Sequence, residues 1–180
     1  MGLAEEVALA ERVIAQTARR LTGEKVMPDR LVSLADTDAR PVRRGKPQKP
    51  TEFGYKASIA DTPEGLVVSH QVYAGNPADV STLDAAVLGA REAGMHIDTV
   101  LADRGNSTGD EVLDRLHIKD RVIPRQGKAD PAQHTRRWRR RYRHRAGCEG
   151  RISHLKRRHG LARTRLKGHE RTQIWVGHGF

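Results

Sequence analysis

The spacing of apolar and polar positions divides the chain into a leading helix and a longer region of mixed strands and helices. Apolar residues recur at helical spacing over residues 3–22, and Gly23 follows as a stop. This stretch is predicted to be an amphipathic helix without obvious chemistry of its own. Residues 31–35 have the composition of a short strand, and the charged, Gly- and Pro-rich residues 36–52 are typical of a loop.

The next part of the chain has the pattern of an α/β fold. Two runs rich in apolar and β-branched residues, 53–60 and 66–74, flank a Pro- and Gly-containing turn, which predicts a β-hairpin. The elements predicted after the hairpin are a helix from about Asp79 to Ala93, a strand at 97–102, a helix near 108–117 and a strand at 121–124. This order predicts that the last two strands are parallel, joined by a right-handed crossover.

Charge is concentrated near the C-terminal end. The whole chain has a formal charge of +11, yet residues 136–171 alone contain 15 Lys and Arg against two acids, Glu149 and Glu170. A near-neutral body with one strongly basic region is typical of proteins that bind nucleic-acid phosphates. A solvated basic tail is the plain alternative, but Trp138, Tyr142 and Leu155 supply apolar anchors that such tails usually lack.

Four residues of the basic region fall on one face of a helix. Tyr142, Arg145, Glu149 and Lys156 stand at offsets of 3, 7 and 14 from the tyrosine, which brings them within roughly 60° on a continuous helix. Glycine is unfavourable inside a helix by about 1 kcal/mol. Gly147 and Gly150 therefore make the run from Glu149 to Arg158 the better supported helix.

Asp103 is the second acid with a position suited to chemistry. It follows an apolar strand and precedes Arg-Gly-Asn, so its carboxylate is expected at the carboxyl edge of a sheet, where ligands bind in open α/β folds. The alternative is an aspartate that only caps its own turn. Together with Glu149, it forms a pair of hard oxygen donors suited to Mg²⁺, and two such ions about 4 Å apart can promote phosphoryl transfer.

These residues resemble a known family. The spacing Tyr142-x2-Arg145-x3-Glu149-x6-Lys156 is similar to the YREK signature of bacterial insertion-sequence transposases of the DDE class. The segments FGYKASIADTPEGLVVSHQVYAGNPAD, VLADRGN and CEGRISHLKRRHGLARTRLKG resemble the paired strands, the strand with the second Asp, and the helix with the Glu. The resemblance runs from about Arg30 to the C-terminal end.

The resemblance implies an RNase H-like mixed α/β fold with strands 1–3 antiparallel and strands 4 and 5 parallel. The domains would be an N-terminal helix at 1–25 and a partial catalytic domain at 26–180. It implies a Mg²⁺ or Mn²⁺ site containing Asp103 and Glu149, cleavage of double-stranded DNA at transposon ends, and strand transfer into target DNA. The residues expected to contact DNA are Tyr142, Arg145, Lys156, Arg157 and Arg158. A homodimer is the candidate assembly.

The first Asp of the family is not obvious in this sequence. Asp36 is a superficial candidate, whereas the relatives suggest that the first Asp, the first strand and the DNA-binding region lie upstream of Met1. The chain is therefore expected to be an N-terminally truncated transposase, and residues 175–180 look like a final helix cut short. A non-catalytic, basic DNA-binding remnant is the main alternative. A ribosome-associated protein has only the charge in its favour.

Other classes of protein find little support. Cys148 is the only cysteine, which excludes an intramolecular disulfide and fits a reducing cytoplasm. There is no signal-peptide pattern or apolar run long enough for a membrane span. His144, Cys148 and His154 are close in sequence but lack paired zinc-ligand spacing, so Cys148 is expected to be a packing residue. Nucleotide-binding glycine motifs are absent.

Overall fold

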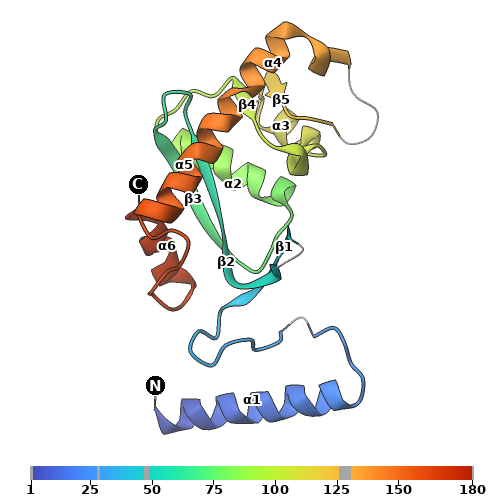
Figure 1. The fold of residues 1–180 in the computed structure, drawn as a ribbon, viewed down its shortest axis with the longest axis vertical. Coiled ribbons are helices and arrows are strands. Elements are labelled where there is room, and N and C mark those ends of the chain that lie inside the picture. The colour runs from blue at the N-terminus through green and yellow to red at the C-terminus, as the bar shows by residue number, and fades with distance from the viewer. Residues whose placement is uncertain (1, 28, 47–48, 126–130, 180) are drawn as a thin grey trace.

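The computed structural model describes all residues except 1, 28, 47–48, 126–130 and 180, and it combines helices with two small sheets (Figure 1). The strands are β1 (Arg40–Lys46), β2 (Lys49–Asp61), β3 (Val67–Ala74), β4 (Thr99–Leu101) and β5 (Asp120–Val122). The α-helices are α1 (Leu3–Leu21), α2 (Asp79–Glu92), α3 (Asp110–Arg115), α4 (Arg136–Tyr142), α5 (His144–Arg158) and α6 (His169–Gly177). Short 3₁₀ turns lie at η1 (Arg104–Asn106) and η2 (Pro131–His134).

The strands form an antiparallel sheet in the order β1-β2-β3 and a separate parallel pair, β4-β5. The predicted hairpin is confirmed: β2 and β3 pair with Ile59 opposite His70. The predicted parallel pairing is also confirmed, with Val100 opposite Arg121. In the described residues the two sheets share no ladder, so the strands do not form one continuous sheet.

The predictions of a strand at residues 31–35 and of a loop over residues 40–46 and 49–52 were wrong. Residues 31–35 form no strand, and β1 together with the start of β2 occupies most of the stretch predicted as a loop, of which residues 36–39 lack strand structure and 47–48 lie outside the described residues. β1 is rich in Arg and Lys, and Val42 is its one strongly buried apolar side chain, at 3% exposure. Pairing with β2 through residues such as Val42, opposite Glu52, therefore outweighs a composition that favours a loop.

The core lies where α2 and α3 pack against the parallel strands. Buried side chains from these elements and the adjoining loops meet here: Leu83, Val87, Leu113, Leu116, Ile118 and Ile123. The partly buried Val100 and Ala102 pack on this cluster from β4 and the residue after it. This packing fixes the end of β4, and with it the position of Asp103.

The two faces of β3 carry different helices. Successive strand residues point to opposite faces. Ser69 meets α2, because its Oγ lies where a Cβ on Gly89 would be, whereas the adjacent His70 meets Gly177 of α6. Gln173 of α6 also accepts a hydrogen bond from Val72 N at 2.7 Å and donates one to His70 O at 3.2 Å. α6 therefore covers the outer edge of β3 as well as contacting the sheet.

The basic region forms two almost continuous helices. α4 ends at Tyr142 and α5 begins at His144, and the residue between them, Arg143, keeps helical dihedral angles. The helix thus begins earlier than Glu149, the start that the glycine argument favoured. The guanidinium of Arg151 lies over Gly147, where an added Cβ would be 3.2 Å from its Nη1 atom. The absence of a side chain at Gly147 therefore lets Arg151 pack close to the helix.

α1 lies apart from the rest of the fold at one end of the molecule (Figure 1). None of its residues is buried, and the side-chain amide of Gln16 exchanges hydrogen bonds with both backbone groups of Leu31, at 2.9 Å and 3.1 Å. Among the described residues, every helix is too short or too polar to cross a membrane. The predicted mixed α/β class is confirmed, and the arrangement is consistent with an RNase H-like domain.

Candidate active site

Asp103 lies just after β4, where the strand gives way to the η1 turn. Its Oδ1 atom accepts hydrogen bonds from Gly105 N at 3.0 Å and from Asn106 Nδ2 at 2.9 Å. The capping role considered from the sequence is therefore real. The second oxygen, Oδ2, faces Arg145 of α5 at 3.8 Å, and the side chain is 42% exposed. One oxygen thus orients the carboxylate while the other is directed toward the basic helix.

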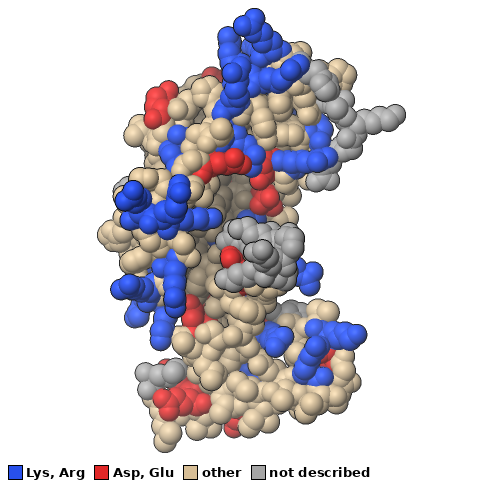
Figure 2. Space-filling model, in the orientation of Figure 1, with Lys and Arg blue, Asp and Glu red and all other residues tan. Residues whose placement is uncertain are grey.

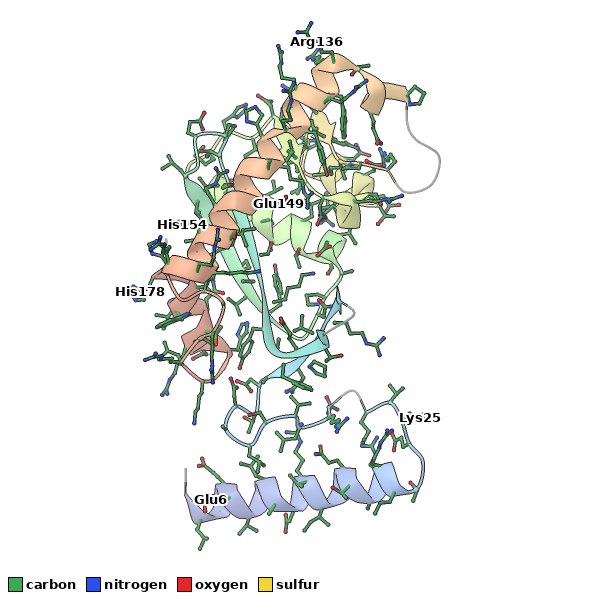
Figure 3. The ribbon with its side chains drawn as sticks, in the orientation of Figure 1. Glu6, Lys25, Arg136, Glu149, His154 and His178 are labelled. Atoms are coloured by element: carbon green, nitrogen blue, oxygen red, sulfur yellow. The ribbon has the colours of Figure 1, made fainter. Side chains whose placement is uncertain are left out.

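Arg145 brings Asp103 and Glu149 together. Its Nη2 atom lies 2.9 Å from Glu149 Oε1, one helical turn along α5, and 3.8 Å from Asp103 Oδ2. Both contacts involve the same nitrogen atom. The distance between Asp103 Oδ2 and Glu149 Oε1 therefore cannot exceed the sum of these two distances. Figure 3 shows Glu149 midway along α5, between Arg136 at the start of α4 and His154 toward the other end of α5.

Asp79 is a further carboxylate, close to Asp103, that the sequence did not single out. A Cβ added at Gly105 would overlap Asp79 Oδ2 and would lie 3.1 Å from Asp103 Oδ1. The two aspartates therefore converge on Gly105, where only glycine leaves enough room. Lys56 of β2 donates to Asp79 Oδ1 at 2.6 Å and to Pro77 O at 2.6 Å, which ties the hairpin to the start of α2.

The sequence did contain a signal for Asp79. It follows Gly75-Asn76-Pro77, which breaks the strand, and it begins α2, so the sequence pattern marked it only as the approximate start of a helix. Its closeness to Asp103 depends on the packing of α2 against η1, which no local pattern reveals.

A column of aromatic and cationic side chains, formed by Trp138, Tyr142 and Arg145, extends along α4 and α5 to the two carboxylates. The rings of Trp138 and Tyr142 stack with centroids 4.7 Å apart and planes 19° from parallel. The Arg145 guanidinium carbon lies 5.9 Å from the Tyr142 centroid, within the usual range of a cation–π contact. Tyr142, Arg145 and Glu149, three of the four residues expected on one face with Lys156, are therefore linked by contacts, and the linked row begins one turn earlier, at Trp138.

Basic side chains surround this column. In Figure 2, Lys and Arg atoms cluster over α4 and along α5, with a few acidic atoms between the two groups. Lys156, Arg157 and Arg158 are exposed on the last turn of α5. At the other side of the site, Arg141 of α4 donates to Thr99 Oγ1 at 3.0 Å and pairs with Asp120. Arg141 thus fastens α4 to the beginnings of both parallel strands.

The contacts of Asp36 indicate a structural role. Its Oδ1 atom accepts a hydrogen bond from Tyr55 Oη at 2.7 Å and one from Gly168 N, just before α6, at 3.3 Å. Burial and the neighbouring Asp36 carboxylate raise the pKa of Tyr55, so its hydroxyl remains a donor. These contacts join the segment before β1 to β2 and α6.

The donor set fits a hard divalent cation in part. Carboxylates are the ligands that Mg²⁺ and Mn²⁺ favour, and Asp103 and Glu149 supply two. Within the described residues, no three His, Cys, Asp or Glu side chains form a group close enough to hold a metal ion. The same finding gives no support to zinc at His144, Cys148 and His154. Cys148 lies instead beside Asp61.

Comparison with known proteins identifies the family. The model of the transposase DDE domain matches residues 30–178, which is most of the chain. No curated protein and no solved structure matched it. The matched range includes the hairpin, the parallel strands, Asp103 and the whole basic region. By this match, the chain belongs to the family of DDE transposases, consistent with an origin in an insertion sequence.

Proposed function

We propose that the chain catalyses metal-dependent phosphoryl transfer on double-stranded DNA, the chemistry of transposon-end cleavage and strand transfer, at Asp103 and Glu149. The observation that carries this proposal is the shared contact of both carboxylates with Arg145. Acids from a β-strand end and a distant helix are thereby brought to one place beside a basic surface. The domain would extend over residues 26–180, and its DNA substrate would place the activity in the cytoplasm.

The proposed reaction exchanges one bond to phosphorus for another. In cleavage, a water oxygen bonds to phosphorus while the bond from phosphorus to a bridging oxygen breaks, and a proton from water ends on the departing oxygen. In strand transfer, a DNA hydroxyl replaces the water. A divalent cation would activate the attacking oxygen and stabilise the departing one. Asp103 and Glu149 would hold it, with Asn106 and Gly105 N fixing the orientation of Asp103.

The basic face would hold the DNA backbone. Arg145 reaches the carboxylates, so a phosphate bound to it would lie at the reacting position. Arginine is suited to this contact because its planar fork matches phosphate oxygens. Lys156, Arg157 and Arg158 would bind phosphates further along the duplex, and Tyr142 would lie against the DNA beside Arg145.

Plasmid cleavage tests this function. The chain is expected to nick supercoiled DNA when Mn²⁺ or Mg²⁺ is present and not when EDTA is added. Asp103→Asn and Glu149→Gln should each reduce nicking by at least about 10³-fold, since each removes a charged metal ligand. DNA affinity, measured by fluorescence anisotropy, should be retained in both variants. Unchanged nicking by either variant would contradict the proposed site.

A non-catalytic DNA-binding protein is the second candidate. It is favoured by the lack, among the described residues, of a group of three metal-ligating side chains. On this alternative the chain binds DNA with equal affinity in Mn²⁺ and EDTA and produces no nicks. The same plasmid assay therefore separates the two candidates.

A further inference from the structure

Arg145 occupies the space between the two carboxylates that the proposed function assigns to a cation. Its Nη2 atom contacts Glu149 at 2.9 Å and Asp103 at 3.8 Å, so one guanidinium charge is shared between the two acids. A guanidinium and a divalent cation that needs the same oxygens cannot both keep these contacts. Closing the two carboxylates on one ion requires Arg145 to move away from at least one of them.

Arg145 has a second class of acceptor within its reach. Its side chain is 33% exposed, and its guanidinium carbon lies over the Tyr142 ring, which stacks on Trp138, within the basic region of the chain. A phosphate in this position offers oxygens that match the arginine fork. The neighbouring stack limits the directions in which the guanidinium can turn, and the basic face favours the arrival of a phosphate there.

We propose that Arg145 is an exchangeable counter-ion that couples DNA binding to metal binding. Without DNA it pairs with Asp103 and Glu149 and weakens the binding of a divalent cation. With DNA it turns to a phosphate, and the carboxylates become available to the cation. This inference rests on the proposed function and adds its regulation: the metal site forms fully only on a bound substrate, which prevents premature chemistry at an empty site.

Linkage makes the coupling reciprocal. If DNA tightens metal binding by a given factor, the metal must tighten DNA binding by the same factor. An exchange of one ion pair for another is expected to give a factor on the order of tenfold. Arg145→Gln removes the competing charge, so the variant should bind the cation more tightly than the natural chain when DNA is absent, and DNA should then add little.

Mn²⁺ binding to the full chain provides the test. Free Mn²⁺ is followed by electron paramagnetic resonance with and without a short duplex, and binding to the duplex alone is subtracted. For the natural chain, the duplex should lower the Mn²⁺ dissociation constant about tenfold. For Arg145→Gln, the constant should already be lower without DNA and should change by less than about twofold on its addition.

Arg115→Gln is the matched control. Arg115 forms an exposed ion pair with Asp84, so this variant loses the same charge from an arginine–aspartate pair outside the proposed site. It should keep the full coupling. Persistent coupling in Arg145→Gln, or weaker Mn²⁺ binding by it without DNA, would overturn the inference.

Two further variants distinguish failure of the inference from failure of the proposed function. If Mn²⁺ binding is lost in Asp103→Asn and Glu149→Gln, while Arg145→Gln leaves the coupling intact, only the role of Arg145 is wrong. If Mn²⁺ binding is the same in the natural chain, Asp103→Asn and Glu149→Gln, the metal site itself is wrong, and both proposals are overturned.

Discussion

At the scale of single residues, Cys148 shows how the site helix is packed. Its thiol is half-buried beside Asp61, at the end of β2. Burial, followed by the charge and hydrogen bonding of Asp61, raises its pKa from an ordinary 9.0 to about 11. The thiol is therefore neutral at physiological pH and a poor nucleophile, which agrees with the packing role expected from the sequence.

The raised pKa predicts slow alkylation. In the folded chain, iodoacetamide should modify Cys148 slowly at about pH 8, and the rate should rise until about pH 11, because only the thiolate reacts. The folded state holds this proton more tightly than the unfolded state. Its contribution to stability is therefore complete below about pH 9 and is lost as the pH rises toward about 11. Mass spectrometry gives the rate, and a folded-state rate equal to that in urea would show the thiol to be freely exposed.

At the scale of elements, α5 is fastened to the hairpin by the ion pair between Arg151 and Asp61. Arg151 donates from Nε to Asp61 Oδ2 at 2.5 Å, and the Asp61 side chain is only 13% exposed. Leu155, one turn further along, is buried. Because Glu149 and Arg145 lie on the same helix, the Arg151–Asp61 ion pair also helps to set the position of the candidate site.

Removing only the Arg151 charge from this ion pair should lower the free energy of unfolding more than removing both charges. Arg151→Met leaves the Asp61 carboxylate buried without its partner, and we expect it to lower the free energy of unfolding by roughly 1–3 kcal/mol. The double variant Asp61→Asn/Arg151→Met should recover part of that loss. Urea denaturation measures both. Arg158→Met, at the exposed end of α5, is the control and should change stability by less than about 0.5 kcal/mol. Equal losses of unfolding free energy in the single and double variants would show that the unpaired Asp61 carboxylate is not the cause.

The sequence predicted those elements whose own pattern decides their structure. The β2–β3 hairpin and the parallel β4–β5 pair have strong apolar runs and clear turns, and both are confirmed. β1 was missed because its strand structure depends on pairing with β2. The start of α5 was placed too late, because the glycine penalty does not include the packing of Arg151 over Gly147.

The residues of the candidate site also fall into two groups, those that the sequence identified and those that it did not. Asp103 and Glu149 were identified from a strand end and a helical spacing, and the fold brings them together through Arg145. Asp79 and Lys56 were missed, because they join the site through contacts between α2, β2 and the η1 turn that are remote in sequence. Sequence patterns identify candidate site residues, whereas the neighbours that other helices and strands bring to them are seen only in the folded structure.

At the scale of the whole molecule, charge is separated along the chain. The region that forms α4, α5 and the segment leading to α6 carries more positive charge than the net +11 of the whole chain, and the remainder is close to neutral. Such a distribution gives the molecule one face for a polyanion. Binding there should be governed by phosphate contacts and should show little preference for base sequence.

Salt dependence measures these contacts. Each phosphate neutralised contributes about 0.9 to the slope of log affinity against log salt concentration. We expect Arg157→Gln/Arg158→Gln to reduce that slope by about 2. Arg19→Gln/Arg20→Gln removes the same charge from α1, remote from the basic face, and should leave the slope nearly unchanged (Figure 1). Fluorescence anisotropy over a salt series gives the values, and equal changes in both pairs would indicate an effect of net charge alone.

The contact of Gln173, from α6, with the edge of β3 affects how copies of the protein behave together. An exposed strand edge offers unpaired backbone groups that another chain can extend into a shared sheet. Gln173 uses its amide to occupy Val72 N and His70 O, as a neighbouring strand would. In the folded chain, α6 thus leaves this part of the β3 edge without free backbone groups for another copy to pair with. Its loss would appear first as insoluble protein, before any effect on DNA could be measured.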